Sequence, residues 1–148
     1  SLQPRMAVLA FLSAIFGPFV GAIIGLLGHA LGDAVFYGSV WWSWVFPEAV
    51  VGIAIGAFAK KFAVKEGGFD KKNIILFNIV QIVSNAAAWI LVAPVLDIAV
   101  YAEPAKKVFL QGAFAFLGNI IIIGILGSLL LAGYSRVAGK SSSLKKED

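Results

Sequence analysis

Apolar residues dominate the chain and gather in long runs that charged side chains interrupt at only a few places. Residues 6–28 form a run of 23 positions without a charge, and further apolar runs cover residues 45–59, 74–100 and 108–132. A helix rises about 1.5 Å per residue, so roughly 20 apolar residues cross the hydrocarbon core of a bilayer. The pattern therefore predicts an all-α bundle of membrane-spanning helices.

The first long tract, residues 2–37, would measure about 54 Å as one straight helix, which is longer than a membrane is thick. We expect it to break at Gly17-Pro18, because proline lacks a backbone donor and glycine permits a tight reversal. The alternative is one unbroken span over residues 6–28 with an interfacial extension to Tyr37.

Five spans are predicted, within a single transmembrane domain that covers residues 1–134. They comprise residues 2–16, 18–37, 44–60, 74–101 and 107–134. The remaining residues, 135–148, form a polar and charged tail that its composition predicts to be disordered. We also expect a segment upstream of Ser1, since the chain enters an apolar helix almost at once.

Composition and charge agree with a membrane protein. Hydrophobic residues make up 60% of the chain and charged residues 14%, which leaves too little polar surface for a soluble domain of this length. The net charge of +4 does not indicate nucleic-acid binding, because the basic residues lie in loops rather than on one face. The absence of cysteine excludes disulfides and cysteine-ligated metals.

Lysine and arginine also predict the orientation, because cytoplasmic loops carry an excess of both. Nine of the twelve basic residues fall in the loop 60–73 or in the tail. Both segments are therefore predicted to be cytoplasmic, in a multi-pass protein of the bacterial plasma membrane.

Small residues form a stripe on the second span, at Gly21, Gly25, Gly28 and Gly32. Their spacing places them on one helix face, and such faces let two helices approach closely in lipid. Packing inside the bundle and docking of another membrane subunit both remain open as their role.

Polar side chains inside predicted spans indicate a binding site, because they are costly at bilayer depth unless they face protein or water. One stripe runs along a single face of the span 74–101, at Asn78, Gln81, Asn85 and Trp89. Hydrogen bonding between helices is the alternative role for such amides.

His29 and Asp33 are four residues apart and can share a helix face. One histidine with one carboxylate falls short of the three or four ligands of a typical metal site, so no metal and no cofactor is predicted. A proton relay is conceivable, yet no chain of ionisable groups continues across the inner half of the bundle. No phosphate-binding loop or nucleophile triad is evident, so the protein is not predicted to be an enzyme.

Several short motifs together resemble the substrate-binding membrane subunits, or S components, of energy-coupling factor (ECF) transporters. The resemblance is to an incompletely characterised branch of the riboflavin-transporter-like S components and spans nearly the whole chain. Its motifs lie at residues 16–21, 28–33, 41–45, 77–81, 93–97, 101–104 and 111–112.

This resemblance implies a six-helix fold whose first helix is missing from this chain, because residues 1–5 match the start of the second helix. It further implies capture of a water-soluble vitamin or vitamin precursor at the outer face. The protein would deliver this substrate to an ECF scaffold subunit and two ABC ATPases.

Family pockets are built from the outer halves of the last three helices and from the outer loops. Transferred to this sequence, the resemblance points to a set of seven substrate-binding residues: Trp44, Glu48, Asn85, Trp89, Asp97, Tyr101 and Gln111. Two alternatives remain: a membrane scaffold or interaction protein without a small-molecule ligand, and an autonomous proton-coupled carrier.

Overall fold

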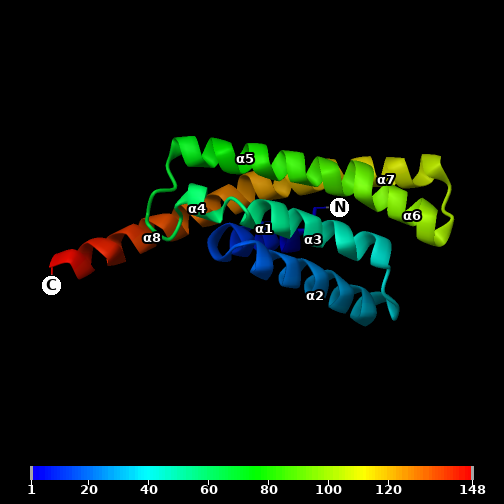
Figure 1. The fold of residues 1–148 in the computed structure, drawn as a ribbon, viewed down its shortest axis with the longest axis horizontal. Coiled ribbons are helices and arrows are strands. Elements are labelled where there is room, and N and C mark those ends of the chain that lie inside the picture. Colours follow the sequence, from blue (N-terminus) through cyan, green and yellow to red (C-terminus); the bar gives the residue numbers. More distant parts are fainter. Residues whose placement is uncertain (1, 148) are drawn as a thin grey trace.

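The protein is an elongated bundle of helices, which a computed structural model describes over residues 2–147 (Figure 1). The described residues contain no strand, as the sequence predicted. The α-helices are α1 (Pro4–Phe16), α2 (Pro18–Tyr37), α3 (Trp42–Gly56), α4 (Ala59–Phe62), α5 (Lys71–Ala86), α6 (Ala93–Tyr101), α7 (Ala105–Ile122) and α8 (Ser128–Glu147). Two π-helical segments, η1 (Ala87–Val92) and η2 (Ile123–Gly127), join α5 to α6 and α7 to α8.

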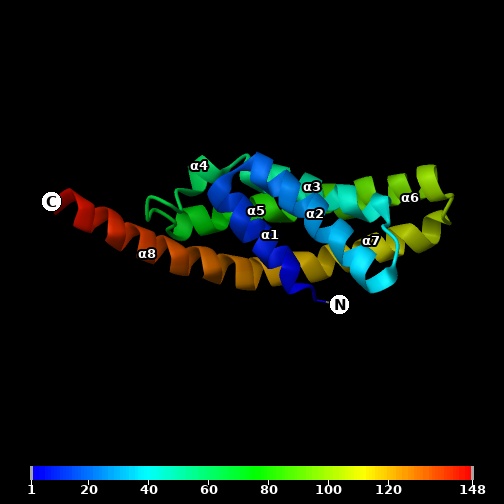
Figure 2. The same cartoon turned by 90° about the horizontal axis from the view of Figure 1, so that it is seen from below.

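The break between α1 and α2 falls at Gly17-Pro18, and the chain reverses direction there (Figure 2). Gly17 has a φ of 100°, a conformation open to glycine but strained for other residues. Pro18 then occupies the first turn of α2, where its missing N–H costs no hydrogen bond. The alternative of one unbroken helix across this point is therefore excluded.

Within the described residues, three continuous helices are long and apolar enough to cross a membrane: residues 18–37, 71–101 and 105–145. Helices α1 and α3 are shorter but also apolar. The outward face of α2 exposes large apolar side chains every fourth residue, at Phe19, Ile23, Leu27, Leu31 and Val35. Such a face suits lipid, and the molecule is an all-α membrane helix bundle.

The polar tail departs from the sequence prediction, because α8 continues as a helix to Glu147 instead of becoming disordered at residue 135. Ser135 is buried, and its hydroxyl accepts a hydrogen bond from the backbone N–H of Phe69 at 3.1 Å. Gly67 lies against Gly139 one turn further along. A helix that is already nucleated extends at little cost, which explains why the polar sequence stays helical.

Helices α2 and α3 form an antiparallel pair with close backbone contacts at each turn. A Cβ atom added to Gly21 would overlap the carbonyl oxygen of Gly52, and one added to Gly56 would overlap Gly17. At Gly25 such an atom would lie 2.7 Å from the carbonyl oxygen of Glu48. Half of the predicted glycine stripe therefore packs inside the bundle.

Candidate functional site

A cavity of about 710 Å³ opens at the end of the bundle where α2 ends, α3 begins and α6 turns into α7. Gly28 and Gly32 lie in this part of α2, and neither has a neighbour within 4 Å of an added Cβ. Helix α2 thus lies tight against α3 at one end, while at the other end it borders the cavity. The lining residues are Leu2, Gln3, Pro4, Arg5, His29, Gly32, Asp33, Phe36, Tyr37, Ser39, Trp41, Trp44, Asp97, Glu103, Lys107 and Gln111.

Asp97 of α6 lines the cavity and hydrogen-bonds to residues at the start of α3. Its side chain is 2% exposed and accepts hydrogen bonds at 2.8 Å from the indole N–H groups of Trp41 and Trp44. The hydroxyl of Ser43 donates a third hydrogen bond. Three donors from one short segment thus converge on a single buried carboxylate.

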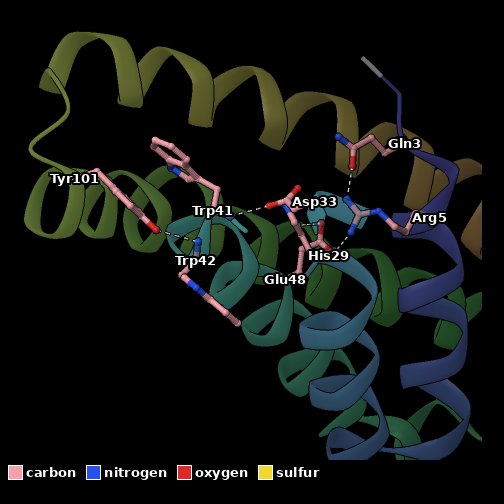
Figure 3. Close-up of polar contacts among 8 residues, drawn as sticks. All are labelled: Gln3, Arg5, His29, Asp33, Trp41, Trp42, Glu48 and Tyr101. Atoms are coloured by element: carbon pink, nitrogen blue, oxygen red, sulfur yellow. Dashed lines mark hydrogen bonds and ion pairs between the residues drawn. The ribbon is translucent and has the colours of Figure 1, made fainter. Parts of the chain in front are cut away.

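A chain of charged side chains links α1, α2 and α3 at the same cavity (Figure 3). Arg5 Nη1 lies 2.5 Å from Glu48 Oε2, and Glu48 Oε1 lies 2.7 Å from His29 Nδ1. The other ring nitrogen of His29 faces Asp33 Oδ1 at 3.4 Å. Glu48 is only 2% exposed, and a buried carboxylate is costly without a partner. Two basic side chains contact it, Arg5 from α1 and His29 from α2.

Trp41 links Asp33 of α2 to Asp97 of α6. Its backbone N–H donates to Asp33, and its indole N–H donates to Asp97. One face of its ring stacks on Tyr101, with ring centroids 4.3 Å apart. The hydroxyl of Tyr101 in turn accepts a hydrogen bond from the backbone N–H of Trp42 (Figure 3). These contacts fix the segment between α2 and α3 against α6.

Behind the cavity wall lie two buried side chains with unpaired polar atoms. Trp89 packs against Trp44 with centroids 5.3 Å apart, and its indole N–H has no hydrogen-bond partner. The side-chain oxygen of Asn85 also lacks a partner, although the amide nitrogen donates to the carbonyl oxygen of Gln81 at 2.8 Å. Unpaired buried groups of this kind need an explanation, such as an ordered water or a ligand.

The π-helical segment η1 carries Trp89 and lies between the amide stripe and Asp97. The backbone of α7 approaches it so closely at Gly112 that an added Cβ would overlap the carbonyl oxygen of Trp89. π-Helical turns occur frequently at functional sites, because they change the direction of the side chains that follow. Here the turn sets the position of Trp89 and of the segment leading to Asp97.

The predicted site residues divide into three groups. Trp44, Asp97 and Gln111 line the cavity itself. Trp89 is buried against Trp44, and Asn85 is fully buried one turn before it, so neither lines the cavity. Glu48 and Tyr101 do not line the cavity but contact residues that do, through His29 and Trp41 respectively.

Arg5 and Trp41 are absent from the predicted set although both line the cavity. The one sequence signal for Arg5 is its charge at the start of an apolar helix. The same signal also marks the end of a membrane span, so it does not identify a site residue. Among the described residues, no three His, Cys, Asp or Glu side chains gather as a metal site would require. The arrangement is suited to noncovalent recognition of a small molecule by aromatic rings and a few polar groups.

Comparisons with known proteins agree on one family. The family model described as "ECF-type riboflavin transporter, S component" matches residues 1–136. A UPF0397 protein of Exiguobacterium is 50% identical over 99% of this chain and 80% of its own length. UPF0397 proteins of Clostridium perfringens and Streptococcus agalactiae are 44% and 46% identical, over 99% of this chain and 80% and 81% of their own lengths. No solved structure matches the chain.

Proposed function

Because this chain belongs to the family of ECF-type riboflavin transporter S components, we propose that it captures a water-soluble vitamin or vitamin precursor for an ATP-driven importer. The observation that carries the proposal is the cavity of about 710 Å³ at one end of the membrane bundle. Its size falls in the range of small-molecule sites, and aromatic rings and a few buried polar groups form its wall.

Three side chains of the cavity wall are assigned to direct contact with the substrate in this proposal. Trp44 offers an aromatic surface, Asp97 an acceptor and Gln111 an amide. Trp89 packs against Trp44, and Asn85 lies one turn before Trp89; in this proposal their unpaired polar atoms bind a ligand group or an ordered water. Glu48 and Tyr101 act as positioning residues through His29 and Trp41.

ATP hydrolysis would be supplied by partners, namely an ECF scaffold subunit and two ABC ATPases, as the family membership suggests. The proposed orientation places the cavity outside the cell, with the loop 60–73 and the end of α8 in the cytoplasm. The distribution of lysine and arginine supports this orientation.

The decisive experiment is mass spectrometry of small molecules released from the full-length protein after gentle purification from a native-like host. We expect one vitamin-sized compound in near-equal amount to the protein. Trp89→Ala and Asn85→Ala should each lower the bound amount. Trp42→Ala is the matched control, because Trp42 is half-exposed and does not line the cavity.

Two outcomes would count against the proposal. Protein that is empty after growth in several media would favour a scaffold role without a ligand. An unchanged amount of ligand in both the Trp89 and the Asn85 variants would remove the assignment of these residues to the site.

A further inference from the structure

The carboxylate of Asp97 has no cationic partner in the part of the chain that the structure describes. None of the described lysine, arginine or histidine side chains lies within 4.0 Å of it. Its three partners are neutral groups, and the two indole N–H groups, which can only donate, occupy both of its oxygens, an arrangement that suits the ionised carboxylate. Asp97 therefore brings an uncompensated negative charge to the cavity wall.

Each of the other charged side chains around the cavity lies beside a basic or acidic partner. Arg5 pairs with Glu48, and Lys107 pairs with Glu103 at 2.8 Å. His29 is the remaining basic group, and it lies between Glu48 and Asp33. Four carboxylates, counting Asp97, thus face two permanent cations and one histidine, so the site stays negative in either protonation state of His29.

Two indole rings lie beside the carboxylate of Asp97. Trp41 and Trp44 both line the cavity, and each donates its indole N–H to Asp97. Their ring edges therefore converge on one carboxylate. Donation to an anion raises the electron density of the indole ring, which strengthens the attraction of its face for a cation.

The carboxylate also keeps capacity for one more partner. Two carboxylate oxygens offer about four acceptor positions, and three donors occupy Asp97 in the structure. Since Asp97 borders the cavity, a ligand N–H or a positive ring can approach the position that remains.

From this arrangement we infer that the cavity selects a flat organic cation, with its positive centre against Asp97 and its ring against Trp41 or Trp44. The inference rests on the proposed function and specifies the substrate class of the same site. An anionic ligand would have to share Arg5 with the buried Glu48, or Lys107 with Glu103, because both permanent cations of the site are already paired.

Three probes of nearly the same shape test the inference: 1-methylnicotinamide, which is a cation, neutral nicotinamide and anionic nicotinate. Their affinities would be measured by titration calorimetry on the full chain in lipid nanodiscs. We expect the cation to bind most tightly to the unsubstituted protein. Asp97→Asn removes the charge and also replaces one oxygen that accepts from an indole N–H by an NH2 group, so it should lower the affinity for the cation about tenfold, equivalent to about 1.4 kcal/mol, and the affinity for neutral nicotinamide by less.

Glu66→Gln is the matched control, since it changes the net charge equally at an exposed position of the 63–70 loop, away from the cavity. It should leave the order of the three probes unchanged. Failure of the cation to bind more tightly than both analogues would overturn the inference, and this result does not depend on the folding of any variant. Retention of the full preference in folded Asp97→Asn would overturn it as well.

The proposed function fails separately from this inference. A neutral or anionic compound that co-purifies in near-equal amount and is lost in Trp89→Ala would overturn the preference for a cation and uphold the capture role. Protein that is consistently empty, and that shows no preference for the cation, would overturn both.

Discussion

The backbone of Gly21 rests directly against the backbone of Gly52, with no room for even a methyl group between them. This contact fixes the position of α2 on α3, and one turn further Gly25 meets Glu48 in the same way. The glycine contacts therefore set the depth at which Glu48 meets His29.

Gly21→Ala should destabilise the protein by about 1–3 kcal/mol, because the added methyl group forces the two helices apart. Gly28→Ala is the matched control on the same helix face, with nothing within 4 Å of the new atom, and should leave the stability unchanged or raise it by up to about 1 kcal/mol, because alanine favours the helix over glycine. Thermal unfolding in detergent measures both. Equal stability of the two variants would contradict the close packing of α2 on α3.

Arg5→Met should lower the stability by about 1–3 kcal/mol, because it leaves the buried Glu48 with His29 as its remaining basic partner. The loss stays below that of a fully buried pair, since the Arg5 side chain is 38% exposed. Adding Glu48→Gln to this variant should recover part of the stability. A double-mutant cycle from unfolding midpoints measures the coupling, and strictly additive effects would show that the pair contributes nothing.

The two neighbouring tryptophans predict unequal results for the same substitution. Trp44→Phe removes a hydrogen bond to an anionic oxygen and should cost about 1.5–3 kcal/mol of stability in addition to the packing lost with the smaller ring. Trp89→Phe removes an N–H that has no partner, so only the packing loss at this buried position remains. Thermal unfolding should therefore show a smaller loss for Trp89→Phe than for Trp44→Phe, and equal losses would contradict the unequal hydrogen bonding of the two indoles.

The orientation can be tested directly because the chain contains no cysteine. Glu66→Cys introduces a cysteine in the loop 63–70 between α4 and α5, and Glu103→Cys introduces one in the turn between α6 and α7. We expect a membrane-impermeant maleimide added to intact cells to label the cysteine at position 103 and to spare the one at 66. Labelling in the reverse order would place the cavity on the cytoplasmic side.

Sequence and structure agree most closely where hydropathy alone decides. The lipid interior offers no partner for backbone polar groups, so each long apolar run forms a helix that satisfies its own hydrogen bonds. Apart from α8, which continues to Glu147, the helices begin and end within four residues of the predicted ranges, and the chain reverses at Gly17-Pro18 as predicted. The prediction of a disordered tail was wrong, because the tail continues the helix that the last apolar run has already formed. Composition alone does not show this continuity.

The sequence by itself determined the all-α membrane fold, the turn at Gly17-Pro18 and the inward face that carries Asn85 and Trp89. Only the tertiary structure decided which polar groups meet. The pairing of Arg5 with Glu48, 43 positions away, and of Trp41 with Asp97, 56 positions away, depends on how each helix is rotated and how deeply it packs. Close glycine contacts and π-helical turns set those rotations, and hydropathy does not record them because they alter neither the length nor the apolar character of a span.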